Sequence, residues 1–178
     1  MTHETALLVI DVQVNMFDEA FPIFQGKLLL EKLCRLIGEA RRNAVPVVYI
    51  QHDGGKGAPD EQGTRGWEIH PDLAPGEEDI VVEKNEPGGF SKTDIHQQLQ
   101  AKNIKHLIVT GIQSEICVQT NCLNALELKY KVTLVEDAHS TFDSDRARAS
   151  ETIERINAEL SDRVLLELAD NIEFSKPL

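Results

Sequence analysis

The chain has 178 residues, of which 41% are hydrophobic and 27% are charged. This composition predicts a single globular domain over residues 1–178. The 18 basic and 30 acidic residues give a net charge of -12, which repels phosphate backbones and anionic lipids, so we expect neither nucleic acid nor membrane as a partner. No apolar stretch approaches the roughly 18 residues that a membrane span needs, and no basic segment precedes a short apolar run at the start. We therefore expect a cytoplasmic protein.

Short apolar runs rich in β-branched residues alternate with helical patterns along the chain. The runs predict six buried strands, at Ala6–Ile10, Val45–Ile50, Ile80–Val82, His106–Thr110, Val132–Val135 and Val164–Leu168. Apolar residues at three- and four-residue spacing predict helices at Leu29–Ala40, Lys92–Lys102, Glu115–Lys129 and Arg146–Leu160. This alternation predicts an α/β fold of three layers, a six-stranded, mainly parallel, Rossmann-like sheet with helices on both faces.

One connection is much longer than the others. The polar stretch Gln51–Pro75 contains five glycines, three prolines and Trp67. Irregular loops of this length inside a compact domain tend to be functional. We expect this loop to shape a pocket.

Reactive side chains follow three of the predicted strands. The first strand ends at Asp11, the third at Lys84, and the fourth runs through Gly111 toward Cys117 at the start of a helix. Ligands of open α/β sheets bind at the carboxyl ends of strands. A carboxylate, an ammonium and a thiol gathered there can form a base, a charge stabiliser and a nucleophile.

Cys117 needs such neighbours because the thiolate is the reactive form and an ordinary thiol pKa of about 8.5 leaves little thiolate at neutral pH. We expect the start of the helix and Lys84 to favour the thiolate, and Asp11 to accept the thiol proton. Backbone amides of Gln113 and Cys117 are candidates for an oxyanion hole. The other cysteines, Cys34 and Cys122, are expected to be free thiols with packing roles, since three cysteines make no disulfide framework.

Each of these residues also has an ordinary structural explanation, so a binding or scaffold protein without catalysis stays an alternative. A cysteine early in a helix is often a small buried hydrophobe, and a strand-end aspartate is often a turn residue. A dinucleotide-binding domain is disfavoured because no Gly-x-Gly-x-x-Gly follows the first strand. A thiol redox role is disfavoured because there is no Cys-x-x-Cys pair.

Three segments together resemble the isochorismatase-like cysteine hydrolases. They are Leu7-Leu8-Val9-Ile10-Asp11-Val12-Gln13, then Val81-Val82-Glu83-Lys84 with Gly89-Phe90 and Thr93, and then Val109-Thr110-Gly111-Ile112-Gln113-Ser114-Glu115-Ile116-Cys117-Val118. The similarity continues through Asp137-Ala138-His139-Ser140-Thr141 and covers nearly the whole chain. Order, spacing and strand context all agree with the family pattern.

The resemblance implies an activity and a site. In that family an Asp–Lys–Cys triad hydrolyses small amides through a thioester, and the matching positions are Asp11, Lys84 and Cys117. It also implies a cis peptide between Ile112 and Gln113 that turns amides toward the oxyanion. No cofactor is implied, the substrate is a small amide or related C–N compound, and the family usually forms homodimers or homotetramers.

The resemblance also suggests which residues line the substrate pocket. The aromatic residues that resemble pocket walls in the family are Phe17, Trp67 and Phe90, although aromatic rings more often lie in the core. The candidates to hydrogen-bond the substrate are His52 and Gln113. For His52, a loop residue hydrogen-bonded to backbone is an equally good interpretation. The full set of predicted pocket residues is Gln13, Phe17, His52, Trp67, Phe90 and Ser114.

The chain departs from the family pattern at three places. Nicotinamidases carry an Asp-x-His pair and a further histidine that bind a metal, whereas this chain reads Gln51-His52-Asp53 and has no histidine until His70. We therefore expect no metal, since His52, Asp53 and His70 lack a chelating spacing. Lys129 stands where many members have glycine, and Asn121 where many have threonine, and we expect both changes to affect local backbone or packing alone.

Overall fold

The computed structural model of the chain describes residues 3–174. Its six strands form one sheet in the order β3-β2-β1-β4-β5-β6, and every neighbouring pair is parallel. The strands are β1 (Thr5–Ile10), β2 (Val47–His52), β3 (Ile80–Lys84), β4 (His106–Ile112), β5 (Lys131–Ser140) and β6 (Leu165–Glu167). The predicted α/β class is thus confirmed, and the sheet is parallel throughout.

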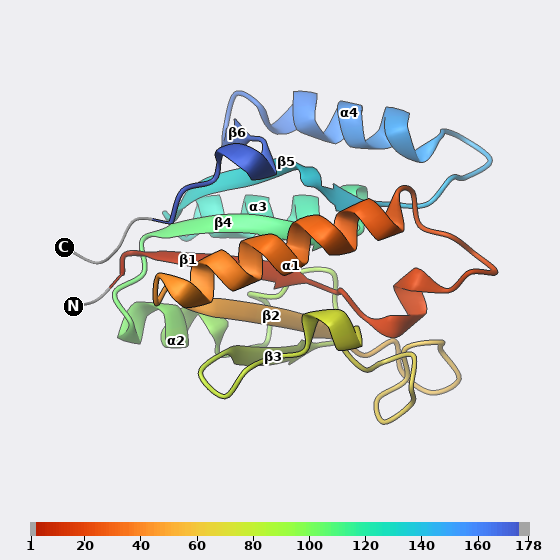
Figure 1. Ribbon diagram of the computed structural model, residues 1–178, viewed down its shortest axis with the longest axis horizontal. Helices are drawn as coiled ribbons and strands as arrows, with labels where there is room; N and C mark the ends of the chain where they lie inside the picture. The colour runs from red at the N-terminus through yellow and green to blue at the C-terminus, as the bar shows by residue number, and fades with distance from the viewer. Residues whose placement is uncertain (1–2, 175–178) are drawn as a thin grey trace.

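Helices cover both faces of the sheet, which makes three layers. Helix α1 (Gly26–Arg42) lies in front of the strands in Figure 1, and α3 (Gln119–Glu127) lies behind them. Helix α1 packs its Leu29, Leu33, Leu36, Ile37 and Ala40 on one face of the central strands. Helices α2 (Ile95–Ala101), α3 and α4 (Ala149–Leu160) supply the apolar cluster on the other face. No helix within residues 3–174 is both long enough and apolar enough to cross a bilayer.

The two outer strands differ from the expectation that all six are buried. Val81 of β3 is 42% exposed and Leu165 of β6 is 49% exposed, whereas Ala6 to Ile10 of β1 are fully buried. A strand at the edge of a sheet has a neighbour on one side alone, and helices need not reach across its outer border. The prediction of burial is therefore right for the inner strands and wrong for β3 and β6.

The order of the strands creates a crevice between β1 and β4. The chain proceeds from β1 to β2 and β3 on one side and from β4 to β5 and β6 on the other, so the loops after β1 and β4 diverge. The two strands approach closely at Gly111, whose φ is +126° and where a Cβ atom would lie 2.2 Å from the carbonyl oxygen of Ile10. Only glycine fits there, and the close approach brings Asp11 beside the segment that carries Cys117.

Candidate active site

Asp11, Lys84 and Cys117 meet at the carboxyl ends of their strands. The Lys84 Nζ atom lies 2.8 Å from Asp11 Oδ2 and 3.4 Å from Cys117 Sγ. The side chains of Asp11 and Lys84 are each 1% exposed, and Cys117 is 9% exposed. The other carboxylate oxygen, Asp11 Oδ1, is buried without a hydrogen-bond partner among the described residues. The three residues therefore form a buried group in which Lys84 holds Oδ2 of Asp11, and the other carboxylate oxygen is left to interact with the Cys117 thiol.

Cys117 lies in a wide turn rather than in the first turn of an α-helix. The predicted helix Glu115–Lys129 is realised as a π-helical turn at Ser114–Val118 followed by α3. The amide of Val118 donates to the carbonyl oxygen of Gln113 at 3.0 Å, which closes the wide turn. The peptide bond between Ile112 and Gln113, just before this turn, is cis.

The charge states of the site differ from the thiolate expected from the sequence. Burial, reinforced by the nearby Asp11 carboxylate, raises the pKa of the Cys117 thiol to about 12, and the attraction of Lys84 does not offset this. Burial also raises the pKa of the Asp11 carboxyl, although Lys84 and Cys117 act to lower it. The sequence led us to expect that Lys84 and the helix start favour the thiolate, whereas burial in the resting site favours the protonated thiol of Cys117 and makes the Asp11 carboxylate a stronger base than usual.

Asn121 joins the loop after β3 to the segment that carries Cys117. Its Oδ1 accepts a hydrogen bond from the Gly89 amide at 2.8 Å, and its Nδ2 donates to the carbonyl oxygens of Cys117 at 2.8 Å and Pro87 at 3.2 Å. The residue is fully buried. The sequence reading that Asn121 affects packing alone missed this bridge, because two of its three partners, Gly89 and Pro87, lie more than thirty residues away in the chain.

Ser114 is held from the other side by a buried hydrogen-bond chain. Ser114 Oγ lies 2.8 Å from His139 Nδ1, and His139 Nε2 lies 2.9 Å from Asn157 Oδ1. Asn157 Nδ2 donates to the carbonyl oxygen of Glu136 at 3.0 Å, so its Oδ1 must accept from His139. The imidazole therefore carries its proton on Nε2 and accepts from the Ser114 hydroxyl. Burial lowers the pKa of His139, which keeps this imidazole neutral.

A cavity of about 880 Å³ opens onto Asp11 and Cys117. Its walls come from the segment after β1, the long loop after β2 and the segments after β3, β4 and β5. The lining residues are Asp11, Asn15, Met16, Asp18, Ala20, Phe21, Pro22, His52, Pro59, Asp60, Pro87, Gln113, Ile116, Cys117, Phe142 and Asp143. The size suits a small organic molecule. The long polar stretch Gln51–Pro75 contributes to this cavity, as expected.

Of the predicted pocket residues, His52 lines the cavity and Gln13 lies behind its wall. His52 Nδ1 lies 2.8 Å from Asp60 Oδ2. Gln13 is fully buried, and its amide group is occupied: it donates to the carbonyl oxygens of His52 and Trp67 and accepts from the His52 amide. Gln13 thus fastens the long loop to the end of β1 instead of facing a substrate.

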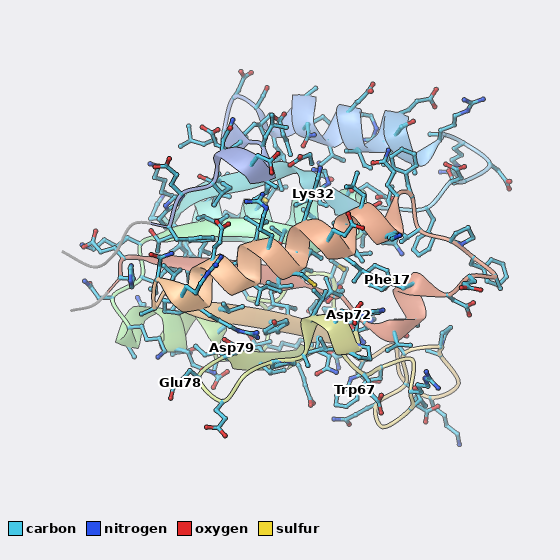
Figure 2. All side chains as sticks on the ribbon, in the orientation of Figure 1. Phe17, Lys32, Trp67, Asp72, Glu78 and Asp79 are labelled. Atoms are coloured by element: carbon cyan, nitrogen blue, oxygen red, sulfur yellow. The ribbon has the colours of Figure 1, made fainter. Side chains whose placement is uncertain are left out.

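The aromatic candidates and Ser114 do not line the cavity either. Figure 2 shows Phe17 and Trp67 at the end of the molecule toward which the strands run. Phe17 packs edge-on against His70, with ring centroids 5.0 Å apart, and Phe90 packs against Tyr130 at 6.1 Å. Ser114 faces His139. Phe17 and Phe90 therefore have packing contacts, which is the alternative that the sequence left open for the aromatics.

The three residues weighed for a metal are not brought together. His52 contacts Asp60, the Asp53 carboxylate accepts from the amides of Gly55 and Gln62, and His70 accepts from the Asp72 amide. Within residues 3–174 no group of three or more His, Cys, Asp or Glu side chains has the arrangement of a metal site. The side chains weighed as metal ligands of the nicotinamidase type thus each contact a different group.

Several cavity residues were not identified from the sequence. Asp18 and Phe21 lie in the irregular segment between β1 and α1, and Phe142 and Asp143 follow β5. The one available signal was position, because both segments follow the carboxyl end of a strand. Their residue types alone are common in surface loops.

The fold and the site together define a doubly wound α/β protein with a ligand cavity at the crossover of its sheet. The chain belongs to the isochorismatase family, because residues 5–163 match the Isochorismatase domain. Streptothricin hydrolase from Streptomyces noursei is 39% identical over 138 residues, which cover 78% of this chain and 50% of that protein. The chain spans about half the length of the streptothricin hydrolases it matches.

Two further relatives cover more of their own length. Ureidoacrylate amidohydrolase RutB from Variovorax paradoxus is 28% identical over 172 residues, covering 76% of this chain and 68% of that protein. The crystal structure of an isochorismatase from Pseudomonas putida superposes with a TM-score of 0.90 at 26% identity, covering 96% of this chain and 90% of that one. The fold expected from the resemblance is therefore confirmed by solved structures.

Proposed function

We propose that this protein hydrolyses a C–N bond of a small amide or ureido compound through a thioester formed on Cys117. The observation that carries the proposal is the contact of Lys84 Nζ with both Asp11 Oδ2 and Cys117 Sγ at the base of a cavity of about 880 Å³. The printed names of two relatives, streptothricin hydrolase and ureidoacrylate amidohydrolase, fit this reaction class.

The first half of the reaction forms the thioester. As Cys117 Sγ attacks the carbonyl carbon, its proton passes to Asp11, and a C–S bond forms while the carbonyl becomes an oxyanion. The C–N bond then breaks, and the amine leaves with the proton that Asp11 returns. Because burial raises the pKa of the Cys117 thiol, we assign the proton transfer to Asp11 to the same step as the attack. The raised pKa of Asp11 suits this task, because a more basic carboxylate accepts the proton more readily.

The second half releases the acid. Asp11 takes a proton from water, the resulting hydroxide attacks the thioester carbonyl, and the C–S bond breaks with return of the proton to sulfur. Lys84 lies against both Asp11 and Cys117, where its ammonium stabilises whichever of the two is negative. Backbone amides of Gln113 and Cys117 are the donors that we assign to the oxyanion.

The proposal is tested with Cys117→Ala and Cys117→Ser, screened against primary amides and ureido compounds for ammonia release. Both variants should lose turnover and retain the unfolding midpoint of the unmodified protein. Cys122→Ala is the matched control, since Cys122 is a buried cysteine on the adjacent helix outside the cavity. A Cys117→Ala protein with the unmodified rate would exclude the mechanism. Binding of amides without hydrolysis by the unmodified protein would favour the binding or scaffold alternative.

A further inference from the structure

His52 is a cavity residue that has no part in the reaction described above. It ends β2, where it lies beside Lys84 of β3 in the register of the sheet. Side chains of parallel neighbours in register leave the sheet on the same face, so the imidazole of His52 and the ammonium of Lys84 share one face. Lys84 contacts Cys117 on that face. His52 is therefore placed beside the reacting group.

The electrostatics of Asp11 agree with this placement. Burial raises the pKa of the Asp11 carboxyl, and Lys84, Cys117 and, least of all, the charge on His52 act to lower it. An imidazole that acts on the Asp11 carboxyl lies close enough to touch a molecule bound over Asp11 and Cys117.

Asp60 fixes the orientation and the tautomer of the His52 imidazole. Asp60 Oδ2 lies 2.8 Å from His52 Nδ1, and the Asp60 side chain is 10% exposed. A carboxylate accepts hydrogen bonds and does not donate them, so Nδ1 carries the proton and the neutral ring has its lone pair at Nε2. No hydrogen bond within residues 3–174 occupies this Nε2 atom, which is not among the buried polar atoms left without a partner. The imidazole thus presents a free acceptor in the wall of the cavity.

The surrounding backbone holds both members of this pair. Gln13 Oε1 accepts from the His52 amide at 2.7 Å, and Gln13 Nε2 donates to the His52 carbonyl oxygen at 2.8 Å. The Gly54 amide donates to the Asp60 carbonyl oxygen at 3.3 Å, and a Cβ atom at Gly54 would lie 2.2 Å from Asp60 Oδ1. Glycine at this position leaves room for the Asp60 carboxylate. An acceptor held in this way from both sides is suited to recognising one group of a ligand.

We propose that His52 is a further catalytic residue of this site, whose Nε2 accepts a hydrogen bond from a substrate N–H group next to the carbonyl that Cys117 attacks, and that Asp60 is its positioning residue. The inference rests on the proposed function, in which Cys117 and Asp11 place the carbonyl. The site then prefers an amide with an N–H beside the carbonyl over the N-methyl analogue, because the methyl compound leaves a desolvated acceptor without a donor.

The first test observes the ring without turnover, by NMR of the Cys117→Ala protein labelled with ¹⁵N-histidine. His52 should be the Nδ1–H tautomer, and methylurea should shift its Nε2 resonance, whereas tetramethylurea, which has no N–H, should not. His70 is the matched control, because the Asp72 amide donates to its Nδ1 and the ring does not line the cavity. It should be the Nε2–H tautomer and respond to neither compound. His52→Gln and His70→Gln assign the signals.

Either of two NMR results would overturn the proposal. One is an Nε2–H tautomer at His52. The other is an equal response of the His52 resonance to methylurea and tetramethylurea, including no response to either.

The second test compares the hydrolysis of an amide with that of its analogue in which N–CH₃ replaces the N–H, followed by mass spectrometry of the products. We expect kcat/KM to be on the order of tenfold higher for the N–H compound. His52→Leu should bring this ratio close to one, Asp60→Asn should lower it, and His52→Gln, whose amide oxygen can accept, should keep part of it. His70→Gln and Asp72→Asn, at a histidine and an aspartate outside the cavity, should leave the ratio unchanged.

The outcomes separate this proposal from the proposed reaction. An unchanged ratio in His52→Leu would remove His52 from substrate contact and leave the hydrolase proposal standing. A selective NMR response to methylurea, without hydrolysis of any amide by the unmodified protein, would support the contact of His52 with an N–H group and defeat the proposed reaction.

Discussion

The hydroxyl of Ser114 donates to Nδ1 of His139 across 2.8 Å, and this contact fixes the start of the turn that carries Cys117. The imidazole is held in turn by Asn157, so the turn is tied to β5 and α4. Neither Ser114 nor His139 lines the cavity. In the proposed reaction we therefore expect them to position Cys117.

Ser114→Ala tests this positioning. The substitution leaves His139 Nδ1 buried without a donor, which should cost about 1–3 kcal/mol of unfolding free energy. Because Cys117 Sγ then moves relative to Asp11, we expect kcat to fall about tenfold or more while KM changes little. Urea unfolding and steady-state kinetics measure the two effects separately.

The control is Thr110→Val, which removes another fully buried hydroxyl, one that donates to the Leu8 carbonyl oxygen at 3.0 Å. It should also lower stability but leave kcat near the unmodified value. Equal losses of kcat in the two variants would show that Ser114 affects stability alone.

The reactivity of Cys117 toward a simple alkylating reagent should depend steeply on pH. Since burial and Asp11 raise the pKa of this thiol to about 12, the thiolate fraction near pH 7 is very small. Iodoacetamide should therefore modify Cys117 slowly at neutral pH and increasingly fast as the pH rises above 9. Peptide mass spectrometry, with the exposed Cys34 as the internal reference, follows the rate at each site. Fast, selective labelling of Cys117 well below pH 8 would contradict the raised pKa.

The pH profile of turnover should instead follow Asp11 on its acidic side. Asp11 accepts the thiol proton when it is ionised, so kcat/KM should fall as the pH drops through the Asp11 pKa. Because burial raises that pKa, the acidic limb should lie above the ordinary value of 3.8. Asp11→Asn should lose turnover across the whole range, and substantial activity in that variant would remove Asp11 from the mechanism.

Asn121→Ala should weaken the attachment of the Cys117 segment to the loop after β3, on the side away from Ser114 and His139. The variant leaves the Gly89 amide and the carbonyl oxygens of Pro87 and Cys117 without their partner, and a buried group left unpaired costs about 1–3 kcal/mol. We expect lower stability together with a lower kcat, measured by thermal unfolding and kinetics. Asn124→Ala on the same helix is the control, and an equal loss of kcat there would argue against a specific role for Asn121.

Much of the site could be located from the sequence because it depends on strand ends. Asp11, Lys84 and Cys117 follow apolar runs that are recognisable one at a time, and parallel strands bring their carboxyl ends to one edge. The raised pKa of Cys117 was not predictable, because it results from burial by segments distant in the chain. The cavity wall formed by Asp18 and Asp143 depends in the same way on the paths of irregular loops.

The departure from the family pattern at Lys129 has a local structural cost. Lys129 has a φ of +68°. Its amide donates to the Leu126 carbonyl oxygen and the Tyr130 amide donates to that of Ala125, each at 3.0 Å, which is the hydrogen-bond pattern of a Schellman motif ending α3. This position favours glycine, because a side chain adds strain in the left-handed region.

Lys129→Gly should therefore raise the unfolding free energy by about 0.5–1 kcal/mol without changing kcat, since Lys129 is exposed and outside the cavity. Lys131→Gly is the comparison, because Lys131 begins β5 and is also exposed. In a strand, glycine lowers stability through the greater entropy of the unfolded chain. The two substitutions remove the same side chain and should shift the urea midpoint in opposite directions. A decrease in both would show that the left-handed strain at Lys129 is smaller than the entropy that glycine adds to the unfolded state.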